Sequence, residues 1–434
     1  MAFATTALLS PTSLYGRSGT LRPFDWSHRV AGAGLVALAV TYGPARIAYG
    51  MFLPELRETF SLSAAAAGGI ASAAYAGYIV TLLAASILTR AWGAKLPVLL
   101  GCCLASLGLA AVSWTTSPLV MMGGVVVAMA ASGLSWTPYN AAVDRVVRRP
   151  KRAQVLSVVS TGTTLGIAFM AVVGLYAGFQ DLSWRMAWAG FAALGLAAAA
   201  VNFVVLPPSL RLRPRPAHRA ARPVQNAGGT KASGVPWRSL LVRGAVPLVA
   251  LSFAQGVGSA VFSAFGVDWV REAGGLDGVS DRAVGALVFL AYGLLGVTGF
   301  LTAVLERRLG LKRLLAAIFA ALATACALLA LAPATWAGAL GAAGLFGAGV
   351  MTVSVVFAMW SMRVFPALPV IGFTVAIVAF ALGGVTGPAA AGMLVDAAGI
   401  AMGTVFAAQA AVYAVMAATS LVAIGVEANE PSAV

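Results

Sequence analysis

Long apolar runs alternate with short polar stretches along nearly the whole chain. A helix needs about 20 apolar residues to cross a bilayer, and the pattern predicts twelve such helices. Six lie in the first half, at about 30–54, 64–89, 94–114, 119–142, 154–178 and 186–207. Six lie in the second half, at about 243–267, 283–305, 311–333, 335–362, 369–395 and 401–425. Because the runs are continuous, they predict an all-α polytopic membrane protein of two six-helix bundles rather than a β-barrel.

The same pattern divides the chain into segments. Residues 208–242 are rich in Arg and Pro and too polar to span a membrane, which predicts a flexible linker. The expected organisation is an N-terminal segment 1–29, a bundle 30–207, the linker, a bundle 243–425 and a tail 426–434. The first segment has no apolar core followed by a small-residue cleavage site, so no removable signal peptide is expected.

A short basic motif occurs once in each set of six. The two copies are Arg90-x-x-Gly93-x-Lys95 and Arg307-x-x-Gly310-x-Lys312. They are 217 positions apart, half of the 434 residues, and each falls between the second and third spans of its set. Internal repeats of hydrophobic segments are typical of secondary transporters, which bind their substrate between the repeats.

Composition and charge support this interpretation and give an orientation. Apolar residues make up 60% of the chain, charged residues 9%, and the mean hydropathy is +0.92, which excludes a soluble protein. Of 28 Lys and Arg residues, 23 fall on the side of the termini and the linker, which predicts that this side is cytoplasmic. The net charge of +15 suits anionic lipids and indicates no nucleic-acid partner. The opposite side has only Arg57, Arg185, Arg271 and Arg282.

Motifs for catalysis or cofactor binding are missing. The three cysteines lie in apolar spans without metal-ligand spacing, and the sequence has neither a phosphate-binding Gly-rich loop with its Lys nor a nucleophile elbow. We therefore expect no enzyme activity, no cofactor and no metal.

The basic motif and its context resemble the major facilitator superfamily over about residues 30–425. In that superfamily a Gly and basic signature occupies the loops between helices 2 and 3 and between helices 8 and 9, as Gly93, Lys95, Gly310 and Lys312 do here. The resemblance implies a multi-pass transporter of the cell membrane, with two six-helix bundles joined by a cytoplasmic linker. The Ala-rich spans indicate a bacterial source.

The signature also departs from the family pattern. Arg90 stands where the family has an Asp, and Glu306 lies one position early, before Arg307. The charge-pair gate of the family is therefore expected to differ here. A prokaryotic subgroup with mostly undefined substrates is similar in two further runs, Gly43-Pro44-Ala45-Arg46 and Trp184-Arg185-x-x-Trp188.

Arg46 is the one charged residue well inside a predicted span. A charge there costs about 2.5–3.5 kcal/mol on insertion scales, so it usually faces a cavity or a partner. Tyr42 and Tyr49 share its helical face, and a guanidinium between two phenols can bind a carboxylate or phosphonate. Gly43 and Pro44 are expected to loosen the helix before it. The alternatives are that Arg46 reaches the outer surface or pairs as an outer gate with Glu55 or Glu58.

The resemblance also implies further wall residues, because helices 1, 4, 7 and 10 line the superfamily's cavity with help from 2, 5, 8 and 11. The candidates that this implies among the residues of these spans are Trp136, Tyr139, Asn140, Ser252, Gln255, Ser259, Tyr75, Tyr78, Tyr292 and Thr374. Gln255 is the first choice among them, because a neutral amide can donate to a bound anion. Each can equally serve helix packing.

Carboxylates are missing from the predicted midplane, since Asp144, Asp268 and Asp396 fall at span ends. This disfavours a cationic substrate. The membrane potential drives an anion outward by about 2.3 kcal/mol per charge per 100 mV, which favours efflux or exchange. For proton-coupled uptake, Asp144 and Asp268 are the candidates.

The sequence therefore predicts a monomeric secondary transporter that moves a small organic anion by alternating access, with membrane lipids and possible proton coupling as its other partners. One alternative is a multidrug exporter using proton antiport. Its aromatic cavity is then formed by Trp136, Tyr139, Phe262 and Phe265. Others are a proton-coupled importer and a non-transporting membrane sensor.

Overall fold

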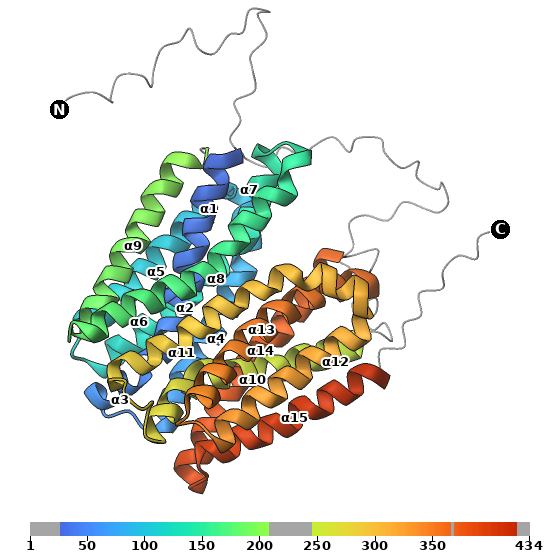
Figure 1. Ribbon diagram of the computed structural model, residues 1–434. Coiled ribbons are helices and arrows are strands. Elements are labelled where there is room, and N and C mark those ends of the chain that lie inside the picture. Colours follow the sequence, from blue (N-terminus) through green and yellow to red (C-terminus); the bar gives the residue numbers. More distant parts are fainter. Residues whose placement is uncertain (1–26, 208–244, 366–368, 423–434) are drawn as a thin grey trace, which may run out of the picture.

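The computed structural model describes residues 27–207, 245–365 and 369–422. Every regular element in these ranges is a helix, as Figure 1 shows. The predicted linker and tail lie outside the described residues, as does nearly all of the predicted N-terminal segment.

The first bundle is formed by residues up to 207. Its helices are α1 (Ser27–Tyr42), α2 (Pro44–Met51), α3 (Leu53–Phe60), α4 (Ala64–Trp92), α5 (Lys95–Trp114), α6 (Pro118–Ala130), α7 (Trp136–Val146), α8 (Arg149–Phe179) and α9 (Trp184–Val205). A short 3₁₀ helix, η2 (Ala131–Leu134), joins α6 to α7. Helices α1 and α2 are the two parts of the first span, and α3 is a short helix after it.

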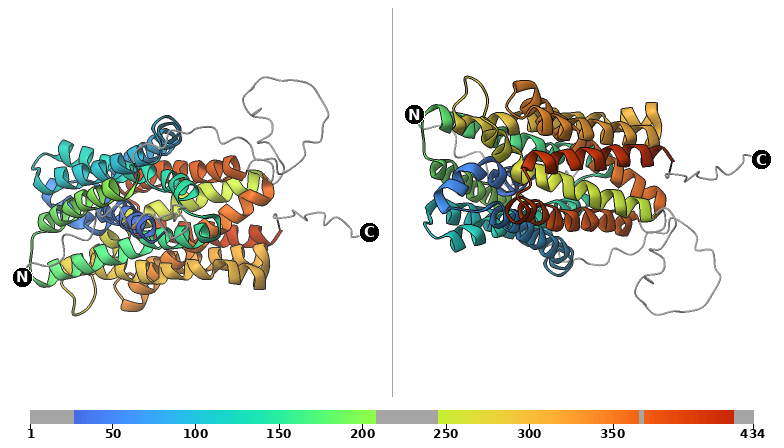
Figure 2. Two further views of the ribbon diagram at one scale, coloured as in Figure 1. Left: turned by 90° about the horizontal axis from the view of Figure 1, so that it is seen from above. Right: turned by 90° about the horizontal axis from the view of Figure 1, so that it is seen from below.

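The second bundle begins at residue 245. Its helices are α10 (Ala245–Glu272), α11 (Asp281–Gly296), α12 (Thr302–Leu331), α13 (Trp336–Val364), α14 (Pro369–Ala398) and α15 (Met402–Val422). The 3₁₀ helix η4 (Val297–Leu301) joins α11 to α12. Figure 2 shows the two bundles from two opposite directions, each perpendicular to the view of Figure 1.

Ranges long and apolar enough to cross a membrane occur eleven times in the part of the chain that the structure describes. The range Asp281–Leu331 has 51 residues and contains two predicted spans, 283–305 and 311–333. Gly310 divides it, because a φ of 75° and a ψ of 162° interrupt the helix there. The twelve predicted spans are therefore present, and the protein is an all-α polytopic membrane protein.

The two bundles repeat one packing scheme. In the first, α1 packs against α8, α4 against α6, and α5 against α9. In the second, α10 packs against α14, α11 against α13, and α12 against α15. These are equivalent pairs when each bundle's spans are counted from its own start. The glycines of the repeated motif agree too, since Gly93 has φ 83° and ψ 177°, close to the values of Gly310.

The bundles contact one another mainly through α4 with α14 and α8 with α11. The backbones approach closely at glycines. A Cβ built on Gly68 would lie 2.1 Å from the Pro388 carbonyl oxygen, and one on Gly50 would lie 1.6 Å from that of Ser263. Figure 1 shows the bundles meeting near α3 and diverging toward the end at which α1 and α10 begin and α9 ends. We call these the α3 end and the linker end.

Candidate functional site

The first span is broken inside the bundle. Helix α1 ends at Tyr42 and α2 begins at Pro44, and Gly43 between them has φ −82° and ψ −103°, outside the helical region. Pro44 lacks an N–H and so fits the first turn of a helix. A Cβ on Gly43 would lie 2.6 Å from the Gly166 carbonyl oxygen, so α8 packs directly against the break. The predicted loosening of the helix before Arg46 is confirmed.

Arg46 lies on α2 within a cluster of tyrosine rings. Its guanidinium carbon is 4.7 Å from the ring centroid of Tyr78, 5.5 Å from that of Tyr75 and 5.6 Å from that of Tyr42. Tyr75 and Tyr78 belong to α4 and are buried, whereas Arg46 and Tyr42 remain part-exposed. A cation–π contact contributes about 0.5–2 kcal/mol, more as water is excluded from it. The rings therefore stabilise the charge of Arg46 without neutralising it.

No carboxylate of the described residues forms an ion pair with Arg46, and Glu58, one of its predicted partners, is exposed. An uncompensated charge at membrane depth is costly and usually faces a ligand or a cavity. The planar guanidinium donates two parallel hydrogen bonds to a carboxylate or phosphate. This arrangement can bind a small anion.

The second bundle brings Tyr292 of α11 to the same place. Its buried hydroxyl lies close enough to Arg46 and Tyr75 to interact with both electrostatically. Its ring stacks on Phe262 of α10 with centroids 5.9 Å apart, and Phe262 stacks on Phe346 of α13 at 4.1 Å. The structure therefore brings four predicted residues together around Arg46, namely Tyr42, Tyr75, Tyr78 and Tyr292.

The predicted residues of α10 are buried polar groups. Ser252 and Gln255 are fully buried and Ser259 nearly so. No described residue offers a hydrogen-bond partner to the amide oxygen or nitrogen of Gln255 or to the Ser252 hydroxyl. Such unpaired groups are rare in native proteins and call for an explanation.

Three other predicted wall residues are half-buried. Trp136 and Asn140 lie on α7, and the Asn140 amide donates to the Trp136 carbonyl oxygen at 3.0 Å. Thr374 lies on α14. None of these three side chains is among the tyrosines whose rings surround Arg46.

Two predicted site residues make contacts elsewhere. The Tyr49 hydroxyl donates to the Ala67 carbonyl oxygen of α4 at 2.9 Å. The prediction that Tyr42, Arg46 and Tyr49 form one face of the site is therefore corrected. The other phenols beside Arg46 come from α4. Tyr139 is fully buried and its hydroxyl donates to Asn202 of α9. Each hydroxyl therefore already donates its proton to a contact within the first bundle.

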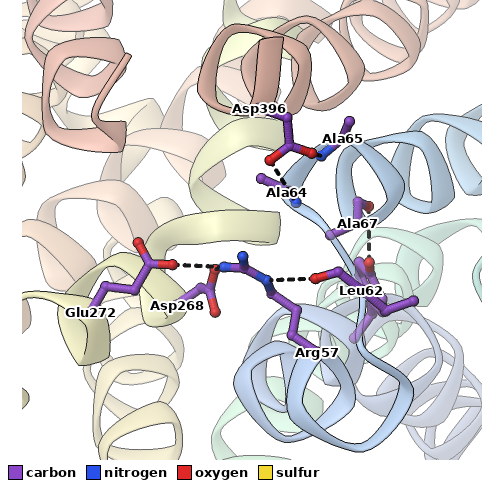
Figure 3. Close-up of polar contacts among 9 residues, drawn as sticks. Arg57, Leu62, Ala64, Ala65, Ala67, Asp268, Glu272 and Asp396 are labelled. Carbon is purple, nitrogen blue, oxygen red and sulfur yellow. Dashed lines mark hydrogen bonds and ion pairs between the residues drawn. The ribbon is translucent and has the colours of Figure 1, made fainter. Parts of the chain in front are cut away.

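A second cluster of charged side chains joins the bundles at the α3 end, as Figure 3 shows. Arg57 of α3 pairs with Asp268 of α10 and, at 2.8 Å, with Glu272. Its Nε also donates to the Leu62 carbonyl oxygen at 3.2 Å. Asp268 is only 8% exposed and Arg57 24%. Because the partners belong to different bundles, these pairs exist only while the bundles are together at this end.

Two more ion pairs cross between the bundles there. Glu55 pairs with Arg271 at 2.8 Å, and Asp181 pairs with Arg282 at 3.1 Å. Burial raises the pKa of Glu55 above its usual value, because water no longer stabilises the charge, although Arg271 opposes this. In this state Glu55 pairs with Arg271 and not with Arg46, the partner that the gate alternative assigns to it.

A helix cap also crosses the boundary (Figure 3). The Asp396 carboxylate of α14 accepts hydrogen bonds from the backbone N–H groups of Ala64, at 3.2 Å, and Ala65, at 2.7 Å. These groups open α4 and have no partner within that helix. A carboxylate also interacts favourably with the positive end of the helix dipole. A side chain of the second bundle therefore completes a helix of the first.

The two candidates for proton coupling lie in different surroundings. Asp268 borders an open cavity of about 390 Å³ at the α3 end. Asp144, at the end of α7, is exposed and pairs with Arg152 at 3.1 Å within the first bundle. The cavity is lined by Pro54, Arg57, Ser61, Leu62, Asp268, Arg271, Glu272 and Asp281.

The repeated basic motif lies at the linker end and makes contacts within each bundle. Lys95 donates to the Phe203 carbonyl oxygen at 2.6 Å, and Glu306 pairs with Arg363 at 2.6 Å. The remaining charged side chains of the motif are exposed, and they are Arg90, Arg307 and Lys312. Where both partners are described, no ion pair joins the bundles at this end.

The ion pairs of the α3 end were missed by sequence reasoning, although a signal was present. Four arginines lie on the sparsely charged side, and three of them, Arg57, Arg271 and Arg282, form the pairs between the bundles. The fourth, Arg185, donates to carbonyls at the end of α5, at 3.0 and 2.6 Å. Arginines on the side where basic residues are rare were therefore the residues to examine.

Two repeated bundles of membrane-spanning helices are typical of secondary transporters, and the first span is broken beside an arginine that has no carboxylate partner among the described residues. The chain matches the family model of the Major Facilitator Superfamily over residues 34–377, and it belongs to that superfamily. The resemblance found in the sequence is confirmed.

Solved structures support the same fold. A nucleoside transporter, NupG, in its D323A mutant form is 14% identical with a TM-score of 0.69, and the match covers 92% of this chain and 100% of that one. A bacterial homologue of the human lysosomal transporter Spinster, in an inward-facing and unoccupied conformation, is 16% identical with a TM-score of 0.64, covering 92% and 94%. A search of curated protein sequences gives no significant match.

Proposed function

We propose that this protein is a secondary active transporter that moves a small organic anion, of the carboxylate type, by alternating access. The observation that carries the proposal is Arg46, a charge without a carboxylate partner among the described residues, held by three tyrosine rings in a broken span. A bound carboxylate would supply the missing negative charge with two parallel hydrogen bonds.

The two bundles are proposed to rock about this site, with residues 30–207 and 243–425 as the moving halves. Arg46 and Tyr75 come from one half and Tyr292 from the other, so an anion bound to Arg46 would contact both. A substrate that contacts both halves can favour one arrangement of them over another, because its contacts differ between the two states.

Orientation decides the direction of transport. We assign the linker end to the cytoplasm, because the Lys and Arg residues concentrate there. The state described here, joined at the α3 end, is then inward-facing. The membrane potential favours outward movement of an anion, so the proposal is efflux or exchange, with proton-coupled uptake through Asp268 as the alternative.

Packing of the aromatic residues favours this proposal over a multidrug exporter. Tyr139, Phe262 and Phe265 are fully buried, and Phe262 lies in a stack with Phe346. Of the four residues expected to form a broad aromatic cavity, only Trp136 is half-buried. Side chains packed in a helical core cannot adapt to ligands of many shapes without disturbing that core.

The test is ligand binding to the purified protein in detergent, followed by thermal stability. Carboxylates and phosphonates should stabilise the wild type, and Arg46→Gln should abolish the shift, because the ion-pairing group is lost. Arg307→Gln, an exposed charge at the linker end, is the matched control and should respond like the wild type. Stabilisation only by cations or by neutral nucleosides, unchanged in Arg46→Gln, would refute the anion proposal.

A further inference from the structure

We infer that the substrate carries a second polar group besides its anionic one, a group that both donates and accepts a hydrogen bond, and that Gln255 and Ser252 bind it. A hydroxyl or an amide has this chemistry. The inference rests on the proposed function, because the anionic group on Arg46 fixes the other end of the substrate.

The first argument is the unused hydrogen-bonding capacity of α10. Gln255 and Ser252 are fully buried, one turn apart, and three of their polar atoms have no partner in the described chain. An amide offers two donors and an acceptor, and a hydroxyl offers both. Leaving such atoms buried and unpaired is unfavourable, so a function that supplies a partner explains their presence.

The second argument is the side of α10 on which these residues lie. Gly256 lies against α14 and Gly258 against α15, so those sides of the helix are occupied by backbone and ring contacts. Phe262, seven residues after Gln255 and hence on the same helical face, stacks on Tyr292. Tyr292 of α11 interacts with Arg46, so the Gln255 face is turned to the side of α10 on which Tyr292 lies and away from α14, against which Gly256 packs.

The third argument is depth along the span. Gly50 of α2 lies against the carbonyl of Ser263 of α10, and both helices run from the linker end toward the α3 end. Counting four residues back from this contact places Arg46 level with Ser259. Gln255 lies one turn further back, a separation of roughly 6 Å at 1.5 Å per residue. The second polar group therefore lies at least about 6 Å from the anionic group, toward the linker end.

These arguments define a class of substrate. A hydroxy- or amido-carboxylate with four or five bonds between its two polar groups spans that distance. A simple fatty acid binds at its carboxylate end only and leaves Gln255 and Ser252 unpaired. It therefore binds more weakly than its hydroxy or amido analogue. One neutral hydrogen bond corresponds to about 3–10-fold in affinity.

The experiment compares valerate with 5-hydroxyvalerate, which differ by one hydroxyl at about the required distance. Dissociation constants are measured by calorimetry on the wild type and two variants. The wild type should prefer 5-hydroxyvalerate by about 3–10-fold, and Gln255→Met should abolish the preference by weakening only that ligand. Gln409→Met is the matched control, since Gln409 is a nearly buried glutamine of α15 that already contacts Cys326 at 3.9 Å. It should keep the preference.

Equal affinity of the wild type for the two ligands overturns the inference, and so does an unchanged preference in Gln255→Met. If Gln255→Met does not fold, Ser252→Ala takes its place and should reduce the preference in the same direction. Valerate binding that depends on Arg46 but shows no preference refutes this inference and leaves the proposed function standing. Binding of neither ligand, or equal binding by Arg46→Gln, refutes the proposed function and this inference with it.

Discussion

The two ends of the molecule are held in different ways. At the α3 end, Arg57, Glu55 and Asp181 form ion pairs with the second bundle, and Asp396 caps α4 from across the boundary. At the linker end, Lys95 and Glu306 of the repeated motif each make a contact inside their own bundle. The sequence repeat is symmetric, whereas the contacts between the bundles are not.

This difference shows which contacts stabilise the present arrangement of the two bundles. Contacts within a bundle survive any rigid movement of the halves, but contacts between the bundles at the α3 end must break before that end can open. An alternating-access cycle therefore needs the α3-end contacts to be individually weak enough to exchange. Substitutions at that end should shift the equilibrium, whereas matched substitutions away from the boundary should not.

The largest effect is expected from Gly68→Val, which makes the close approach of the bundles impossible. A Cβ there would lie 2.1 Å from the Pro388 carbonyl oxygen, and backbone cannot give way as a flexible side chain does. Overpacking costs about 1–3 kcal/mol, so the closed α3 end should be depleted by about fivefold or more. Spin labels at positions 61 and 277, with the native cysteines replaced, would report a longer distance.

The adjacent residue provides the control. A Cβ on Gly69 would meet no heavy atom within 4 Å, so Gly69→Val adds the same side chain to the same helix turn without a clash. It should keep the wild-type distance distribution. A similar shift in both variants would mean that the effect comes from helix propensity and not from the boundary.

A smaller shift is expected when the central ion pair is broken. Arg57→Gln leaves the mostly buried Asp268 without its cation. The cost should be about 1–3 kcal/mol, between the values for exposed and for fully buried pairs. The same label pair measures the closed fraction. Arg57→Gln combined with Asp268→Asn should recover part of it, because the mostly buried carboxylate is then neutral and only the half-exposed Glu272 has lost its partner. A double variant no better than Arg57→Gln alone would contradict this account.

The smallest effect is a pH dependence at Glu55. Burial raises the pKa of Glu55 in the folded protein, so the folded state binds the proton more tightly than the unfolded state does. The free-energy penalty for burying the charged carboxylate is therefore relieved as pH falls toward about 4.3, the pKa of Glu in an unfolded chain. The melting temperature of the wild type relative to Glu55→Gln should therefore rise between pH 7 and pH 5. A difference that falls on acidification would show that the ion pair with Arg271 dominates instead.

Asp181→Asn serves as the control for that titration. The Asp181 carboxylate also pairs across the boundary, at 3.1 Å, but its side chain is 88% exposed. Exposed pairs contribute little to stability, so Asp181→Asn should leave the melting temperature at pH 7 nearly unchanged.

The fold could be predicted because it depends on local properties of the sequence. Span length and the distribution of Lys and Arg gave the twelve helices, and the repeat of Gly93 at Gly310 indicated the two bundles. The loosened first span was also predictable from Gly43 and Pro44, since Gly and Pro act on their own backbone.

The site was predictable only in part. Arg46 was found because a charge inside a span is rare, but its neighbours depend on how α2 packs against α4. Tyr49 shares a face with Arg46 in the sequence pattern, yet its hydroxyl is bound to Ala67. The pair of Arg57 and Asp268 joins residues 211 positions apart, and no spacing rule connects side chains at that separation.

The cap that Asp396 provides makes the folding of one helix depend on the position of another bundle. The Ser63 side chain accepts from the N–H of Ala66, whereas the N–H groups of Ala64 and Ala65 donate to Asp396 of the other bundle. When the α3 end opens, the first turn of α4 loses these bonds and becomes free to unwind. Local melting of one helical turn is therefore coupled to the rigid-body step, so the conformational entropy gained there offsets part of the cost of separating the halves.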